Sequence, residues 1–430
     1  MAVGWRFTEE EFLQPLTNVL SSGKLRLSYG QTGNSNIGNK AISYYQTGYN
    51  NEFGGTESVG VYLSQMGNPD LKWETTTEWN LGLDMGFLNN RLNVTAEYFH
   101  RVVSDLLSDR TLLSYNEVNK ISANIGETQS QGFELTINSK NIETRDFSWS
   151  SDLTFSFYRD KWKTRDETWK PAAYSEYNAP IRYIYGYRAD GLIKEGETVD
   201  WMPGSVPGQV KIKDLNGYVY NEDGTMKVDK NGIPLKSGKP DGKIDEADME
   251  IYGSKDPGYL LGFNNTLRWK NFDLNIYFYG QFGLWNIGSY NDLWLTGADG
   301  MTGIVNMYRG YNMPVSAKDV WSHDNTSASR PGYFQDKSPV PAGSSSTNSV
   351  NPGKIGDYYL EKSWFIRCRN ITLGYTIPMN KKLLSNIRVY ADINNPFMIT
   401  PYDGLDLETD NSVWAYPNVR SFSLGLDITF

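Results

Sequence analysis

The chain has 430 residues, a formal net charge of −9 and 14% aromatic residues, yet only 39% of its residues are hydrophobic. No apolar run approaches the length of about 18 residues that a transmembrane helix needs, and the acidic balance argues against a nucleic-acid partner. One cysteine and two histidines exclude an internal disulfide framework and thiolate zinc sites. An outer-membrane β-barrel passes this screen, because its strands are only half apolar and average hydropathy misses them.

The N-terminal residues predict half a strand followed by a short helix. Residues 3–7 have the pattern of a strand end, and Thr8 followed by Glu11 has the spacing of a helix N-cap with a capping-box glutamate. A complete barrel would not begin with half a strand, because every backbone polar group in lipid must be paired. We therefore expect this sequence to be the C-terminal piece of a larger barrel.

Ten further segments show the period-two alternation of strands with one apolar and one polar face. The last is the clearest, because its even-numbered residues from Phe422 to Phe430 are all apolar and the residues between them are polar or small. The predicted strands cover about residues 24–31, 72–88, 91–107, 124–143, 146–160, 258–270, 271–287, 360–379, 386–400 and 418–430.

The connections between these strands alternate strictly between short turns and long loops. The long loops occupy residues 32–71, 108–123, 161–257, 288–359 and 401–417. Such alternation places all turns at one end of the strands and all loops at the other, as in barrels with short periplasmic turns and long extracellular loops. The predicted fold class is all-β: an antiparallel transmembrane β-barrel, of which this chain supplies about ten strands and a stub.

A set of motifs in fixed order resembles the SusC/RagA-type TonB-dependent outer-membrane transporters of Bacteroidetes-like bacteria. The resemblance implies the C-terminal part of a barrel of about 22 strands, with an N-terminal plug and a TonB box that are absent from residues 1–430. It also implies contact with TonB through that missing part, a SusD-like lipoprotein over the loops, and an oligosaccharide or peptide as cargo. The motifs lie at residues 24–34 (KLRLSYGQTGN), 68–74 (NPDLKWE), 124–135 (NIGETQSQGFEL), 185–191 (YGYRADG), 262–280, 365–378 (FIRCRNITLGYTIP), 387–401 (IRVYADINNPFMITP) and 416–430.

Two acidic stretches suggest a metal site. Asp214 and Asn216 lie in the first, and Asp241, Asp245 and Asp248 lie in the second. Joined, they would form a calcium loop with closely spaced oxygen ligands, and similar transporters carry the joined form DxNGDGxID. Here residues 218–240 interrupt the motif, and Asp stands at its last position instead of Glu. The alternative is a turn held by hydrogen bonds from side chains to the backbone.

Aromatic residues in the long loops are the candidates for cargo contact. They are Trp201, Trp294, Tyr308 and Trp321. Flat aromatic rings with a polar handle suit stacking on sugar rings or clamping of peptide side chains. The alternative is that they hold the long loops together or form the interfacial girdle. Carboxylate pairs such as Asp406 and Glu408 show no sign of convergence, so we expect solvated loop charges there rather than a general acid and base.

The sequence therefore predicts part of an outer-membrane, TonB-dependent importer of nutrient oligomers in a Gram-negative bacterium. We expect contact with membrane lipid, no enzymatic activity of its own, and no cofactor apart from the calcium interpretation above. A secreted β-rich carbohydrate-binding or adhesin module is the first alternative, but it gives no reason for the alternating connections. A closed ten-stranded barrel enzyme is the second, and the sequence offers no convergent catalytic set for it.

Overall fold

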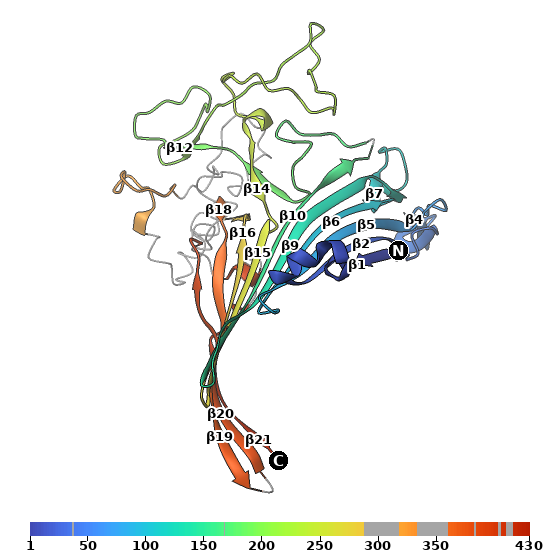
Figure 1. The fold of residues 1–430 in the computed structure, drawn as a ribbon. Coiled ribbons are helices and arrows are strands. Elements are labelled where there is room, and N and C mark those ends of the chain that lie inside the picture. The colour runs from blue at the N-terminus through green and yellow to red at the C-terminus, as the bar shows by residue number, and fades with distance from the viewer. Residues whose placement is uncertain are drawn as a thin grey trace. The chain divides into compact units, whose positions relative to one another are not determined.

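The computed structural model describes residues 1–36, 38–166, 168–287, 318–332, 360–381, 384–402, 406–409 and 416–430. Eleven strands form one antiparallel sheet, in which neighbouring strands follow each other in chain order (Figure 1). The fold class is all-β, as the alternation predicted. The strands are β1 (Ala2–Trp5), β2 (Leu20–Asn34), β5 (Glu74–Phe87), β6 (Leu92–Ser104), β9 (Glu127–Glu143), β10 (Phe147–Thr164), β15 (Tyr259–Trp269), β16 (Phe272–Phe282), β19 (Phe365–Lys381), β20 (Leu384–Ile399) and β21 (Ser421–Thr429).

The observed strands differ from the predicted ones mainly at their ends. β2 starts at Leu20 rather than at 24, and β10 continues to Thr164 rather than 160. In these two strands backbone pairing continues into polar residues beyond the alternating stretch. By contrast, β6 and β16 end before their predicted ends, at Ser104 and Phe282. Sequence periodicity therefore locates the centre of a strand better than its ends.

The helix expected after Thr8 is present only as two 3-10 segments, Phe7–Glu9 and Glu11–Asn18. The first has no side-chain cap, so the predicted capping box is wrong. The hydroxyl of Thr8 instead accepts a hydrogen bond from the Gly23 N–H at 3.0 Å and so ties this segment to β2. Among the described residues, no helix is long and apolar enough to cross a membrane.

The chain divides into two compact units. In the unit of residues 1–135, 157–170 and 178–181, β2 pairs with β5, and β5 pairs with β6. Leu27 lies opposite Leu81, and Leu81 lies opposite Tyr98, so apolar side chains form rows across these three strands. The other face of the same strands carries polar residues.

On this polar face the side chain of one arginine lies over a glycine of the neighbouring strand. Arg26 on β2 lies opposite Gly82 on β5, where a Cβ atom would come within 2.8 Å of the guanidinium carbon. With no side chain in the way, Arg26 binds Asp84 at 2.7 Å and also reaches Glu97 on β6. We call this arrangement an arginine clamp, because one cation joins three strands.

The second unit, residues 136–156, 171–177 and 182–430, contains an arginine clamp of the same kind. Arg388 on β20 binds Asp273 on β16 through two hydrogen bonds of 3.0 and 2.6 Å, and Asp427 on β21 at 3.2 Å. It passes over Gly374 on β19, where a Cβ atom would lie 2.5 Å from an oxygen of Asp273. Arg388 therefore pairs with carboxylates on two other strands of this face.

The opposite face of these strands is apolar and exposed. The row Leu274, Leu373, Ala391 and Leu424 runs across β16, β19, β20 and β21. Leu424 is 87% exposed and Leu373 is 49% exposed. An apolar face of this extent is not stable in water, but it suits contact with lipid, as the apolar band of an outer-membrane barrel does.

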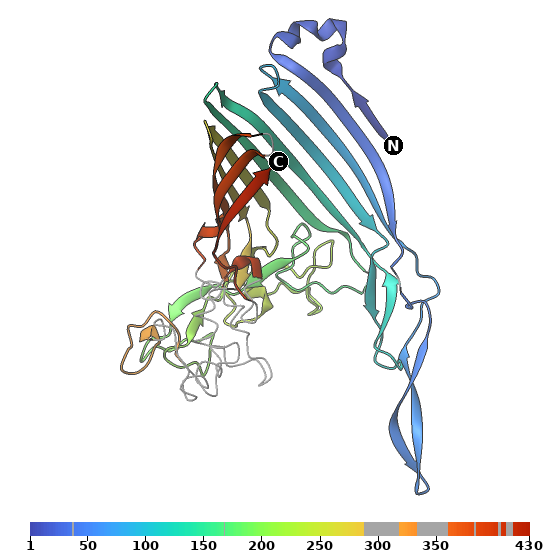
Figure 2. The same cartoon turned by 90° about the horizontal axis from the view of Figure 1, so that it is seen from below.

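Turns and loops lie at opposite ends of the strands. The β5–β6 turn contains Asn89 and Asn90, both in the left-handed region at φ 57° and 59°, as a type I′ hairpin requires. At the other end of β5, the hairpin of β3 (Tyr44–Phe53) and β4 (Thr56–Gln65) extends beyond the strands (Figure 2, blue). The other loop strands form pairs: β7 (Leu107–Thr111) with β8 (Lys120–Asn124), β11 (Tyr183–Gly186) with β14 (Glu250–Ser254), β12 (Ala189–Leu192) with β13 (Val210–Ile212), and β17 (Trp285–Ile287) with β18 (Leu360–Lys362).

Candidate functional site

The long loop between β10 and β15 contains a compact module, which we define as residues 183–254 and call the loop module. Its centre is a cluster of seven buried apolar residues: Tyr187, Ile193, Val199, Met202, Val210, Ile212 and Met249. Met202, Val210 and Ile212 have no exposed surface. Burial of this kind fixes the positions of the polar side chains around it, so the loop module can hold a preformed site.

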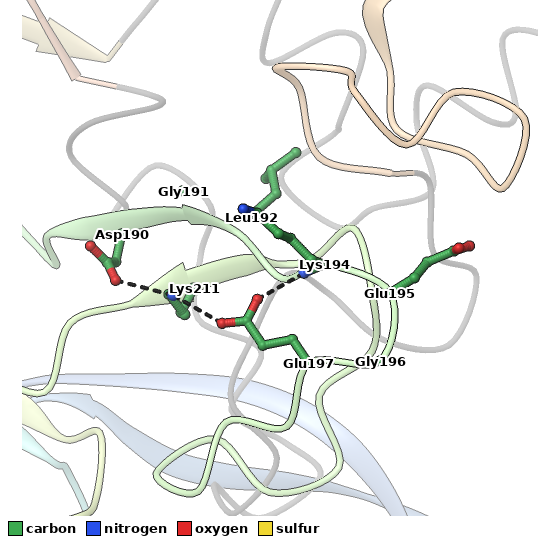
Figure 3. Close-up of a pocket in the computed structure, with 8 residues that line it drawn as sticks. All are labelled: Asp190, Gly191, Leu192, Lys194, Glu195, Gly196, Glu197 and Lys211. Atoms are coloured by element: carbon green, nitrogen blue, oxygen red, sulfur yellow. Dashed lines mark hydrogen bonds and ion pairs between the residues drawn. The ribbon is translucent and has the colours of Figure 1, made fainter.

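The strands β12 and β13 bring charged residues to one edge of the loop module. Ala189 pairs with Ile212 and Leu192 pairs with Val210, so the intervening Asp190 and Lys211 lie near each other on neighbouring strands. They line a cavity of about 510 Å³, which we call the Lys211 cavity. Its other lining residues are Gly191, Leu192, Lys194, Glu195, Gly196 and Glu197 (Figure 3).

Lys211 is the central charge of this cavity. Its ammonium group lies 3.1 Å from Asp190 and 3.0 Å from Glu197, and Figure 3 shows the two carboxylates on either side of it. Glu197 also accepts a hydrogen bond of 2.9 Å from the backbone N–H of Lys194. These contacts raise the pKa of Lys211, and the hydrogen bonds to Glu197 lower the pKa of that carboxyl group. Both groups therefore stay charged across the neutral pH range.

The segment 318–332 contributes to the same region. His323 Nδ1 lies 2.9 Å from a carboxylate oxygen of Glu195, although the sequence showed no partner for this histidine. Trp321 is buried and packs on Gly208, which has a φ of +84° and no room for a side chain. The glycine is needed twice there, for its backbone conformation and for the close approach of the indole ring.

The predicted cargo-contacting aromatics occupy different places. Trp201 packs against the buried cluster of the loop module, and its Nε1 donates a hydrogen bond of 2.8 Å to the carbonyl of Ile212. Trp321 is only 8% exposed. Both contacts fit the alternative role of holding loops together. Trp294 and Tyr308 lie outside the described residues, and cargo contact by these four aromatics stays a prediction.

The structure brings the two acidic stretches together despite the 218–240 insertion. Asp214 accepts hydrogen bonds from the backbone N–H groups of Asp241 at 3.2 Å and Gly242 at 2.7 Å. The Gly217 N–H donates to the carbonyl of Lys239 at 3.0 Å, so the chain returns to its starting point after the insertion. The interrupted motif is therefore rejoined in space.

The carboxylate of Asp248 accepts hydrogen bonds from three backbone N–H groups. One oxygen accepts from Leu215 at 2.7 Å and from Asn216 at 3.0 Å, and the other accepts from Asp245 at 2.9 Å. Asp245 in turn accepts from Ala247 at 2.8 Å, which completes a capping box around the 3-10 turn Glu246–Asp248. Burial raises the pKa of both carboxyl groups.

These contacts match the alternative interpretation, a turn held by hydrogen bonds from side chains to the backbone. In the part of the chain that the structure describes, no group of three or more His, Cys, Asp or Glu side chains is arranged to hold a metal ion. Calcium binding by Asp214, Asn216, Asp241, Asp245 and Asp248 stays a prediction.

A second charged cluster lies where β19 meets the loop before β21. Arg367 is buried and contacts Asp406 at 2.9 Å and Glu408 at 2.6 Å. Asp406 is only 2% exposed and also accepts a hydrogen bond of 2.8 Å from the Asn418 N–H. The expectation of solvated charges at Asp406 and Glu408 was wrong, because this loop folds back onto the end of β19.

The comparisons with known proteins agree with the sheet described above. The profile of the family described as "TonB dependent receptor-like, beta-barrel" matches residues 2–278. The chain belongs to this family. The relative named TonB-dependent receptor SusC, from Bacteroides thetaiotaomicron, is 31% identical over 100% of this chain and 40% of its own length. TonB-dependent receptor P3, from Formosa agariphila, is 29% identical over 100% of this chain and 41% of its own length.

A solved structure shares the fold over the whole chain. The structure of the RagAB peptide transporter superimposes with a TM-score of 0.73 at 21% sequence identity, over 100% of this chain and 43% of that chain. The chain is thus similar to SusC/RagA-type receptors and, like other members of the family, lies in the outer membrane. It spans about two fifths of the length of the relatives it matches.

Sequence reasoning missed the charged residues of the Lys211 cavity. Asp190, Glu197 and Lys211 have no distinctive spacing, and they meet only because β12 pairs with β13. One signal was available, because Asp190 lies in the motif at 185–191 and Lys211 lies just before the acidic stretch that starts at Asp214. Short strands between them would have placed Asp190 near Lys211.

Proposed function

We propose that the whole protein imports nutrient oligomers across the outer membrane, with energy transmitted from TonB and a SusD-like lipoprotein acting over the loops. The observation that carries the proposal is the antiparallel sheet with an exposed apolar face and an ion-paired polar face. A lipid-facing band and a polar lumen are what a transport barrel requires. The similarity to SusC and to the RagAB peptide transporter also supports an import function.

The loop module supports a role in cargo contact. It combines a rigid apolar core with a cavity lined by charges of both signs. Ligand sites are commonly concave and carry a few fixed polar groups on a preformed scaffold. Oligosaccharide and peptide cargo both remain candidates for the protein as a whole.

Uptake by intact cells tests this function. We would delete the gene in the source bacterium and compare growth on single oligosaccharides and on peptides as carbon source. Loss of growth on one class, restored by the intact gene, is the expected result. Unchanged growth on all of them would contradict the proposal, and binding at the cell surface without uptake would favour the adhesin alternative.

A further inference from the structure

A second cavity in this region is lined in part by β14. It has a volume of about 320 Å³ and is lined by Ala173, Tyr174, Ser175, Glu176, Lys236, Glu250 and Ile251. We call it the Tyr174–Lys236 cavity. Its volume is at the lower end of the range of about 300–1,000 Å³ that small-molecule sites occupy.

Lys236 reaches this cavity because of the insertion at 218–240. The insertion folds as a small meander with bridges between Tyr218 and Lys236 and between Val228 and Pro234. Its two tight turns end at Gly224 and Gly232, which have φ values of +83° and +78°. The segment that interrupts the acidic motif therefore supplies the cation of the cavity.

A hydrogen bond holds the ammonium group of Lys236 in place, but no carboxylate of the described residues forms an ion pair with it. Its Nζ donates a hydrogen bond of 2.6 Å to the carbonyl of Met249. An ammonium group has three donors and no acceptor, and among the described residues we find no further hydrogen bond or ion pair of Lys236. Burial lowers the pKa of Lys236, although the nearby carboxylates of Glu250, Asp248, Glu176 and Asp245 oppose this shift.

The carboxylates of the cavity differ in how they are paired. Glu250 forms an ion pair of 2.9 Å with Arg188, whose guanidinium lies over the ring of Tyr252 at 4.3 Å. Glu176 makes no hydrogen bond or ion pair with the residues that the structure describes. The charged side chains that line the cavity are Lys236, Glu176 and Glu250, and Glu250 is paired with Arg188 from outside the lining. Among these four side chains the charges balance, so a neutral ligand would not add an unpaired charge to them.

Tyr174 provides a fixed aromatic wall. Its ring stacks on that of Tyr185 with centroids 4.0 Å apart and an interplanar angle of 12°. Tyr174 also packs against the buried cluster of the loop module. The side chain is therefore positioned before any ligand arrives, which lowers the entropy cost of binding.

We propose that the Tyr174–Lys236 cavity binds one residue of a neutral oligosaccharide. A hydroxyl group both donates and accepts, so one hydroxyl of a vicinal pair can accept from Lys236 while its neighbour donates to Glu176. The apolar side of the sugar ring would lie against Tyr174. A free peptide terminus fits less well, since a carboxylate would meet Glu176 and Glu250 and an ammonium would meet Lys236. The inference rests on the proposed import function and adds the cargo class.

Binding to arrays tests the inference. We would probe an array of neutral, uronic-acid and sulfated glycans, and an array of peptides, with the whole protein purified in detergent from outer membranes. Calorimetry would then measure the affinity for the strongest neutral glycan. Lys236→Met should weaken it about ten- to hundredfold, as expected for loss of a hydrogen bond from a charged donor. Glu176→Gln should weaken it by a smaller factor.

Lys230→Met is the matched control, since Lys230 is exposed on a turn of the same insertion. It should bind as the unmodified protein does, and all variants should reach the outer membrane in equal amounts. Binding only to peptides or to charged glycans, no glycan binding at all, or equal affinity of Lys236→Met would overturn the inference. If the deletion strain loses uptake while Lys236→Met retains full glycan affinity, the import function stands and only the cavity assignment fails.

Discussion

The main sheet and the loop module differ in where their apolar side chains lie. On β21 the apolar residues face outward, and Phe422, Leu424 and Leu426 are 58–87% exposed. In the loop module the apolar residues face inward, and Met202 and Val210 are fully buried. In both regions apolar side chains are removed from water. In the sheet they contact lipid, whereas in the loop module they pack against one another in a core.

This difference explains why the chain is so polar for its length. A strand in a barrel needs one apolar face for lipid and one polar face for the lumen, so half of its residues are polar without any cost in burial. The charges on the polar face are paired by the two arginine clamps at Arg26 and Arg388. The loop module is organised like a small water-soluble domain and has no such constraint.

Truncation of the loop core tests whether the two regions are stable independently. Met202→Ala should destabilise the loop module by about 2–5 kcal/mol, the usual cost of a large-to-small change at a fully buried site. Limited proteolysis of outer-membrane vesicles should then cleave within 183–254. The sheet should remain folded, as judged by the mobility of unheated and heated samples on gels. A sheet that unfolds together with the loop module would show that the two regions are one cooperative unit.

A change of charge on each face of β21 tests the assignment of the lipid side. Leu424→Arg should cost about 2–4 kcal/mol if Leu424 lies near the bilayer midplane, and it should lower the amount of assembled protein. Asp427→Asn should be tolerated, since Asp427 is half-exposed and Arg388 keeps its two hydrogen bonds to Asp273. Equal effects of the two substitutions on assembly would refute the facing assignment.

An added methyl group tests the arginine clamp. Gly374→Ala would place Cβ 2.5 Å from Asp273 and 2.7 Å from Arg388, so the ion pair must shift. We expect the free energy of unfolding to fall by about 1–3 kcal/mol, as at other overpacked sites. The measurement is the temperature at which the folded barrel unfolds, judged by its mobility on gels after heating. The control is Gly30→Ala, because Gly30 has no atom within 4 Å of a Cβ position. If both variants unfold at the same temperature, the glycine is not required for the clamp.

The sheet was predictable from the sequence because strand alternation is a local signal. Each of the ten expected strands overlaps one strand of the main sheet, and the stub at 3–7 is β1. The charged sites were not predictable, because they depend on contacts between distant segments. Arg367 and Asp406 are 39 residues apart in the chain, and no local pattern shows that their loop folds back onto β19.

The acidic motif illustrates a partial success. Its composition located a turn rich in Asp and Asn, and Asp214 does meet Asp241. The sequence could not show that the two acidic stretches meet, because the insertion separates them. Their contact depends on the hydrogen bond from the Gly217 N–H to the Lys239 carbonyl. The position of Lys236 in a cavity was equally hidden, since the path of the insertion decides it.

The smallest effect is expected where a loop aromatic serves only packing. Trp201→Phe removes the indole donor to the Ile212 carbonyl but keeps an aromatic ring in the loop module. We expect a loss of about 0.5–1.5 kcal/mol in local stability, the usual net value of one hydrogen bond, measured as a modest increase in the rate of proteolysis within 183–254. Glycan affinity should stay unchanged, because Trp201 does not line the Tyr174–Lys236 cavity. A large loss of affinity with unchanged proteolysis would instead assign Trp201 to cargo contact, and the core of the loop module would then be part of the binding surface.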